Sequence, residues 1–175
     1  MTNSTKSDTG LAAVRWLAFM DNIDERGRLT AVESGISLPF PIRRVFYVHQ
    51  VLPGEDRGGH AHRDTDQVLT AVGGSLHVVV SDGREHRRYR LDHPGWGIYL
   101  PRMIWVRMYD FSRGSACLVF ASTHYDRSMS IRTWREYLQE LGRSWFPEPG
   151  LETPLVADAP VDRQTKQNNA AGGTS

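Results

Sequence analysis

The stretch RGGHAHRDTDQ, residues 57–67, places two histidines directly after a pair of glycines. His60 and His62 are two positions apart, so on a β-strand both side chains lie on the same face. Imidazole binds divalent metals, and it also accepts and returns protons near neutral pH, because its unperturbed pKa is about 6.5. The spacing indicates half of a metal site or a pair of proton-transferring groups. We favour these two functional interpretations over a structural one, in which both imidazole rings only form hydrogen bonds with loop carbonyls or water.

The spacing around this pair resembles the first motif of the cupin family, G-x5-H-x-H-x3,4-E-x6-G. The positions in register are Gly54, His60, His62 and Gly74. The position of the motif's glutamate is occupied by Gln67. In the second cupin motif, G-x5-P-x-G-x2-H, Gly95 and Pro101 are in register. Met103 then replaces the glycine and Val106 the histidine.

Two of the four ligands of a cupin metal site are therefore replaced. The Val106 side chain has no lone pair, and the primary amide of Gln67 is a poor ligand for the metals that imidazole binds well. Asp66 is one residue out of register, so on a strand it points to the opposite face. We predict no bound metal and no cofactor, which leaves both imidazoles available for acid–base chemistry.

Size and composition indicate one soluble globular domain of 175 residues, with 39% hydrophobic and 23% charged residues. The formal net charge of +1 gives no reason to expect a nucleic acid or a membrane surface as partner. A single cysteine, Cys117, excludes an internal disulfide and fits a reducing compartment. Because the first ten residues also lack the apolar segment of a signal peptide, we expect a cytoplasmic location.

Short runs with strand-like composition, separated by turn residues, fill the middle of the chain. They cover residues 28–33, 44–51, 67–72, 75–82, 85–92, 96–100, 104–111 and 116–123. One amphipathic helix is predicted over 131–141, with Ser130 as its N-cap. This order predicts an all-β jelly roll or barrel over residues 11–146. Residues 1–10 are expected to be a disordered arm, and residues 147–175 a disordered or loosely packed tail.

Five segments closely resemble the sugar 3,4-ketoisomerases that act on thymidine-diphosphate-4-keto-6-deoxyhexoses. They are DERGRLTAVE (24–33), PIRRVFYV (41–48), RGGHAHRDTDQVL (57–69), WGIYLPRMIWVRMYDFS (96–112) and ASTHYDRSMSIRTWREYL (121–138). The resemblance covers about residues 11–141, and R-G-x-H-A-H is its most specific part. It implies a metal-free cupin jelly-roll barrel with one C-terminal helix, in a homodimer that exchanges N-terminal strands.

The resemblance also implies a reaction in deoxysugar biosynthesis. A base removes the proton on C3, an enediol forms across C3–C4, and a proton delivered to C4 leaves the ketone at C3. His60 matches the family's base and His62 its hydrogen-bonding neighbour, although spacing alone does not rank the two. The implied partner is a thymidine-diphosphate-sugar substrate.

Four further residues are candidates for binding the substrate. Arg26 and Arg57 lie in the matching motifs, and a guanidinium donates paired hydrogen bonds to pyrophosphate or hydroxyl oxygens. Gln67 lines up with the cavity and can hydrogen-bond the sugar. The family often has two tyrosines where this chain has Phe46 and Tyr47, so a water molecule or Tyr47 must replace the hydroxyl that is missing at position 46.

Two other functions stay open from the sequence. One is a sugar-nucleotide 3,5-epimerase, which also needs a histidine base on this scaffold. The other is a non-catalytic cupin that binds a sugar nucleotide, which the residues at 46 and 106 keep possible. The motif at 57–62 and the segment 121–138 favour the isomerase.

Overall fold

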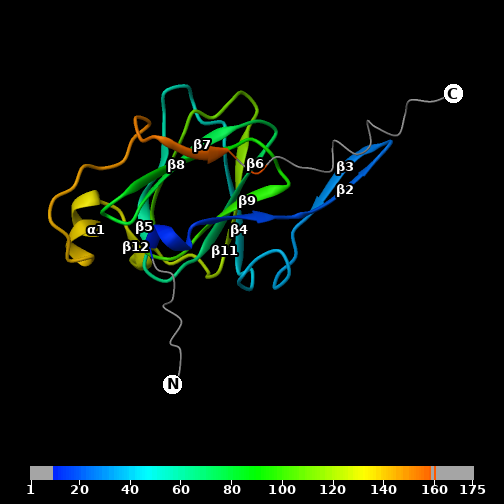
Figure 1. Cartoon of the computed structure of the whole chain (residues 1–175). Helices are drawn as coiled ribbons and strands as arrows, with labels where there is room; N and C mark the ends of the chain where they lie inside the picture. The colour runs from blue at the N-terminus through cyan, green and yellow to red at the C-terminus, as the bar shows by residue number, and fades with distance from the viewer. Residues whose placement is uncertain (1–9, 159, 161–175) are drawn as a thin grey trace, which may run out of the picture.

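The computed structural model describes residues 10–158 and 160. Most of these form two largely antiparallel sheets packed face to face, and a separate two-stranded ribbon extends from them (Figure 1). The first sheet has five strands in the order β1 (Arg15–Ala18), β9 (Trp96–Leu100), β6 (Gln67–Val72), β11 (Ala116–Ala121) and β4 (Arg44–His49). Strand β4 is an edge strand whose exposed and half-buried residues alternate. This alternation assigns each of its side chains to one face of the sheet.

The second sheet has six strands. Their order is β12 (Ser130–Ile131), β5 (Arg57–His62), β10 (Trp105–Tyr109), β7 (Leu76–Ser81), β8 (His86–Leu91) and β13 (Leu155–Asp158). Only β13 pairs in parallel, with β8. Strand β5, which carries both histidines, lies between β10 and the two-residue strand β12.

The main core fills the space between the two sheets. It consists of apolar residues that alternate along the strands, including Leu69 and Ile98 of the first sheet and Val78, Val80 and Val106 of the second. All five are at most 2% exposed. Burial of this alternating set on both inner faces is the main force that holds the sheets together.

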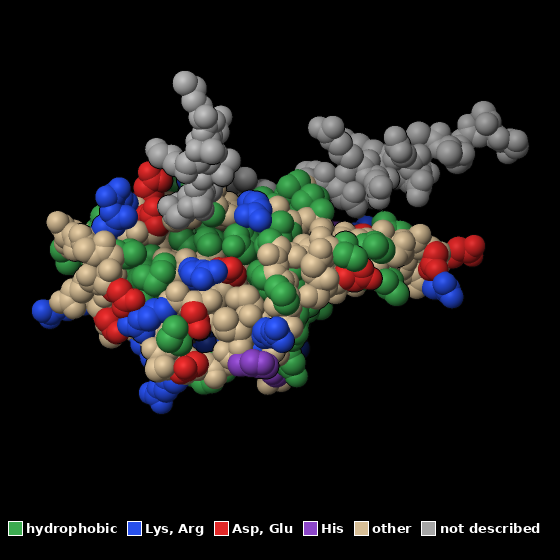
Figure 2. Space-filling model, turned by 90° about the horizontal axis from the view of Figure 1, so that it is seen from below, with side chains coloured by type: hydrophobic (Ala, Val, Ile, Leu, Met, Phe, Trp, Pro, Cys, Tyr) green, Lys and Arg blue, Asp and Glu red, His purple; other side chains and the backbone are tan. Residues whose placement is uncertain are grey.

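A two-stranded arm, β2 (Met20–Asp24) and β3 (Gly27–Ala31), leaves the body of the molecule (Figure 1). Its apolar side chains are largely open to solvent, since Met20 is 51%, Ile23 51% and Leu29 61% exposed. Hydrophobic side chains lie along the arm in Figure 2, and charged side chains gather at its tip. An isolated two-stranded ribbon is marginally stable in water, so the arm lacks the packing that such a ribbon needs.

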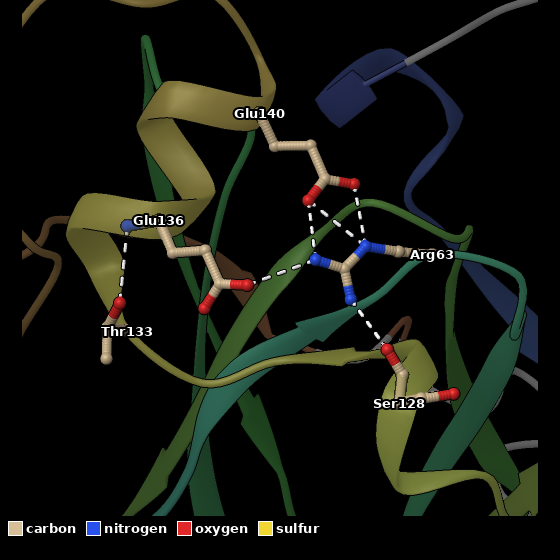
Figure 3. A network of polar contacts seen from close by, with 5 residues as sticks. All are labelled: Arg63, Ser128, Thr133, Glu136 and Glu140. Carbon is tan, nitrogen blue, oxygen red and sulfur yellow. Dashed lines mark hydrogen bonds and ion pairs between the residues drawn. The ribbon is translucent and has the colours of Figure 1, made fainter.

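The α-helix α1 (Trp134–Glu140) covers the end of the second sheet near β5. Thr133 is its N-cap, because the Thr133 hydroxyl accepts a hydrogen bond from the Glu136 amide. The Arg63 guanidinium, directly after β5, donates to the Glu136 and Glu140 carboxylates and to the Ser128 carbonyl (Figure 3). These contacts fix the helix and the segment before it against the histidine strand.

Beyond the helix, residues 143–158, here called the C-terminal strap, run across the second sheet to β13 (orange in Figure 1). The Trp134 indole nitrogen donates to the Phe146 carbonyl at 2.6 Å. Arg88 donates to the Leu151 carbonyl at 2.8 Å, and Arg107 pairs with Glu148 at 3.2 Å. The described part of the predicted tail therefore lies against the body.

The all-β class with one late α-helix is confirmed, as two facing sheets. Each of the eight predicted strand ranges contains most of a strand, namely β3, β4, β6, β7, β8, β9, β10 and β11. The prediction of Ser130 as the helix cap is wrong, because the helix begins later and Ser130 lies in β12. The predicted arm 1–10 falls outside the described residues except for Gly10.

Candidate active site

A cavity of about 310 Å³ lies beside the histidine strand. Its wall consists of seven residues: Arg44, Phe46, His60, His62, Tyr125, Ser130 and Arg132. They come from three places that are distant in sequence, which are β4, β5 and the segment that leads into α1. Pairing of β12 with β5 brings the third of these segments to the histidines.

The two histidines face the cavity together, as their spacing on a strand predicts. Their ring centroids are 4.8 Å apart and the ring planes meet at 76°. In the ladder, His60 lies opposite Val106 and His62 opposite Ser130. The side chain that replaces the fourth cupin ligand is thus an isopropyl group in the core, directly across from His60.

Burial lowers the pKa of both imidazoles, because it penalises the charged form. For His62 the pKa falls to about 4, with repulsion from His60 and Arg44 as the next causes. For His60 the pKa falls below its ordinary value of 6.5, mainly by burial, with Arg132 and Arg44 adding to the effect. Both rings are therefore neutral at pH 7 and able to accept a proton.

Ser130 gives the two rings different surroundings. The Ser130 hydroxyl lies 3.3 Å from Nδ1 of His62, and both residues are 9% exposed. This contact engages Nδ1 and leaves Nε2 as the nitrogen available to a ligand. His60 has no such side-chain partner among the hydrogen bonds of the described chain.

Two guanidinium groups supply hydrogen-bond donors to the cavity. The Nε and Nη1 atoms of Arg44 are buried and have no partner within the described residues. Buried donors of this kind are normally satisfied, so their presence in a cavity wall indicates a place for a ligand's oxygen atoms. Arg132 donates to the Tyr125 hydroxyl at 3.1 Å.

The cavity offers little to a metal ion. The described residues contain no group of three or more histidine, cysteine or acidic side chains that could hold one. Asp66 lines a different cavity from the histidines, and its carboxylate accepts from the Arg102 amide at 2.8 Å. The donors that do face the cavity, two imidazoles and two guanidiniums, suit an oxygen-rich organic ligand.

The structure does not bring Tyr47 or Gln67 to this cavity within one chain. Tyr47 is 63% exposed and lines a separate cavity of about 710 Å³. Side chains alternate along β4, so Tyr47 lies on the face opposite to that of Arg44 and Phe46. Gln67 is 4% exposed at the start of β6, between Leu100 and Ala121 of the neighbouring strands.

Arg26 and Arg57 also lie outside the cavity wall of a single chain. Arg26 is at the tip of the arm, where it pairs with Asp24 and its side chain is 90% exposed. Arg57 is the first residue of β5 and is exposed.

The sequence interpretation missed Arg44, Tyr125, Ser130 and Arg132 as wall residues. A signal existed for Arg44, since it is two positions before Phe46 and period-two alternation puts both on one face. None existed for Ser130 and Arg132. Their position depends on the two-residue pairing of β12 with β5, which is too short to leave a pattern.

Comparison with known proteins identifies a family. The family described as FdtA, WxcM-like, C-terminal matches residues 12–142. A TDP-4-oxo-6-deoxy-alpha-D-glucose-3,4-oxoisomerase from Aneurinibacillus thermoaerophilus is 36% identical over 125 residues, which are 71% of this chain and 90% of the relative.

Two solved structures extend this similarity to the fold. A 3,4-ketoisomerase from Helicobacter canadensis superposes with a TM-score of 0.72 at 35% identity, covering 74% of this chain and 98% of that one. A histidine-to-asparagine mutant of the 3,4-ketoisomerase from Thermoanaerobacterium thermosaccharolyticum, in complex with TDP-4-keto-6-deoxyglucose, gives 0.71 at 35% identity, covering 73% and 92%. The chain belongs to the FdtA/WxcM-like family of sugar 3,4-ketoisomerases.

Proposed function

We propose that this enzyme converts a thymidine-diphosphate-4-keto-6-deoxyhexose to its 3-keto isomer through an enediol, using His60 as the base. The observation that carries the assignment is the pair of neutral imidazoles in one cavity, next to the unpartnered Arg44 donors. A relative of 35% identity forms a complex with TDP-4-keto-6-deoxyglucose when one of its histidines is replaced by asparagine. A sugar ketone beside these rings has an acidic C3 proton within reach of a base.

The surroundings of the two rings favour His60 over His62 as that base. A base with a pKa of about 4, as for His62, holds a proton poorly at neutral pH. His62 is also engaged at Nδ1 by Ser130. We therefore assign His62 to hydrogen-bonding the substrate and to holding the ring of His60 in place at 4.8 Å.

We further propose that the enzyme acts as a homodimer in which the β2–β3 arm packs on the partner. The exposed apolar residues Met20, Ile23 and Leu29 need a covering surface, and the arm would carry Arg26 towards a second chain. Arg57 is assigned to the pyrophosphate side of the same site. Light scattering on the purified protein should give twice the mass of the chain, and a monomer at micromolar concentration would contradict the dimer.

The cytoplasm is the proposed location, and nucleic acids and membranes are not proposed as partners. Cys117 is buried, and as the single cysteine it forms no disulfide within the chain. No helix of the described residues is long and apolar enough to cross a membrane. Fractionation of expressing cells, followed by immunodetection, tests the location.

Incubation with TDP-4-keto-6-deoxyglucose in deuterated water, followed by NMR of the product, tests the reaction. The isomerase moves the ketone to C3, and solvent deuterium taken up by the base appears on C4 of the product, because C3 of the product carries no hydrogen. A 3,5-epimerase instead labels and inverts C3 and C5, and a protein that only binds the sugar nucleotide does neither. Either of these two results would overturn the proposal.

The variant His60→Asn tests the base. It should lose isomerisation by a factor on the order of 10² to 10⁴, because general acid–base catalysis supplies about that much. Binding of thymidine diphosphate, measured by calorimetry, should change little, since the asparagine keeps the size and polarity of the site. Full activity in this variant would remove His60 from the role of base.

A further inference from the structure

The proposed reaction, on which this inference rests, moves protons on oxygen as well as on carbon. Besides the transfer from C3 to C4, the O4 atom must gain a proton as its ketone becomes a hydroxyl, and the O3 atom must lose one. A group that serves both oxygens has to donate a proton first and accept one afterwards. Hydroxyl groups meet that requirement, whereas a guanidinium only donates and keeps its charge.

Only two hydroxyl side chains line the cavity within the described residues, Ser130 and Tyr125. Ser130 is 9% exposed and its hydroxyl lies against the His62 ring. Tyr125 is 60% exposed, so a substrate can reach it. The guanidinium carbon of Arg44 lies 5.2 Å from the centroid of the Tyr125 ring and 5.1 Å from that of the Phe46 ring.

The contacts of the Tyr125 hydroxyl favour proton donation to the cavity. Arg132 donates to the Tyr125 oxygen at 3.1 Å, and because a guanidinium cannot accept, the hydroxyl proton of Tyr125 must point to another partner. The Arg132 guanidinium places positive charge beside the oxygen, and the Arg44 guanidinium lies over the Tyr125 ring.

We propose that Tyr125 is a catalytic residue that carries the proton between O4 and O3. His60 removes the C3 proton, the C3–H electron pair forms the C3=C4 bond, and O4 takes the Tyr125 proton as its carbonyl opens. In the second half, the phenolate takes the O3 proton and the C3=O3 bond forms. The C3=C4 pair then takes a proton from His60 at C4, so both residues return to their starting states.

Tyr47, which the sequence analysis offers as a substitute for the hydroxyl missing at position 46, faces the other side of β4. A strand residue cannot reach the opposite face without a shift in register, and the six paired positions of β4 and β11 form one continuous ladder. Tyr125 comes instead from the loop after β11, on the same side of the sheet as Phe46.

The variant Tyr125→Phe tests the assignment, with Tyr109→Phe as the matched control. Tyr109 lies on β10 outside the cavity wall, and within the described residues its hydroxyl makes a single long hydrogen bond, 3.4 Å from the Pro149 carbonyl. In Tyr125→Phe we expect kcat for ketone transfer to fall about 100-fold, as for loss of a general acid–base group, while Tyr109→Phe stays at the wild-type rate. Thermal melting checks that both variants fold.

The outcomes separate this inference from the proposed function. If the wild-type protein does not move the ketone at all, the function itself is wrong. If the wild type does so, a kcat at least tenfold lower in Tyr125→Phe with less than tenfold weaker binding of thymidine diphosphate supports the inference. Retention of more than a tenth of kcat, or tenfold or greater weakening of that binding, overturns it.

Discussion

At the scale of single residues, the cavity sets the charge state of its histidines. Both imidazoles have lowered pKa values because they are buried next to each other and near Arg44 and Arg132. The base is therefore unprotonated over a wider range of pH than a free histidine is. A conventional cupin metal site would use the same rings as ligands, but the side chain of Val106, opposite His60, has no lone pair that could complete that ligand set.

This charge state predicts the pH dependence of the reaction. A base works only when it is deprotonated, so a pKa below 6.5 keeps His60 active as the pH falls through the ordinary range of imidazole. The acidic limb of kcat/KM should therefore have its midpoint below pH 6.5. A profile measured between about pH 5 and pH 8, where imidazoles titrate, checks this. A midpoint at or above the ordinary imidazole value would contradict the prediction, because it would mean that burial does not lower the pKa of His60 in the working enzyme.

The sequence predicts the histidine pair of this site better than it predicts the other residues that line the cavity. The common face of His60 and His62 follows from their spacing, because side chains alternate along a strand. The same rule places Arg44 with Phe46 and turns Tyr47 away. Tyr125 and the residues around it lie some sixty positions further along the chain, and no local pattern links that segment to β5.

At the scale of elements, strand β5 requires glycine where it carries the histidines to the cavity. The ladder between β5 and β10 shifts register between Val106 and Arg107, next to Gly58. Gly58 has a φ of +92°, and a Cβ atom there would lie 2.6 Å from the Val106 carbonyl oxygen. The glycine before the histidines thus allows the close approach that sets the register of His60 against Val106.

The substitution Gly58→Ala should lower the free energy of unfolding by about 2 kcal/mol, because it combines backbone strain with a contact against main-chain atoms. It should also reduce kcat, since relief of the contact moves β5 and His60 with it. Urea unfolding and the ketone-transfer assay measure the two effects. Gly59→Ala is the control, with a φ of +65° but no atom within 4 Å of the new Cβ, so only strain of about 1 kcal/mol is expected. Equal losses in both variants would contradict a role for the close approach.

The elements that the sequence predicts are those with strong alternation and clear turn residues. The ranges 67–72 and 96–100 coincide with β6 and β9. The predicted strand ranges leave out five strands of the described chain, β1, β2, β5, β12 and β13. Of these, β12 and β13 exist through pairing with a strand from another part of the chain. The helix is predicted too early because Ser130 is a good cap by type, but pairing with His62 holds it in a strand and Thr133 caps the helix instead.

At the scale of the whole molecule, the C-terminal strap lies outside the family domain. The family match ends at residue 142. The alignment with the structure from Helicobacter canadensis includes 98% of that chain but only 74% of this one. None of the seven cavity residues belongs to the strap. The strap contacts the outside of the second sheet. There the Arg107 guanidinium forms an ion pair with Glu148 of the strap at 3.2 Å and another with Asp56, just before β5, at 2.8 Å.

Removal of residues 143–175 should therefore lower the stability of the protein but leave its catalytic activity nearly unchanged. The shortened protein should still isomerise the substrate within about threefold of the full chain, because the cavity wall is intact and product formation needs no group from the strap. Its melting temperature should fall by about 2–4 °C for each kcal/mol that the strap contributes, since Trp134 and Arg88 lose hydrogen-bond partners.

Calorimetry and the NMR assay on the two proteins measure both effects, and Glu148→Gln, which breaks only the pair with Arg107, should give a smaller fall. An unchanged melting temperature would mean that the ordering of the strap offsets its contacts. A loss of activity at unchanged substrate binding would instead mean that the strap holds β5 in its working position through Asp56.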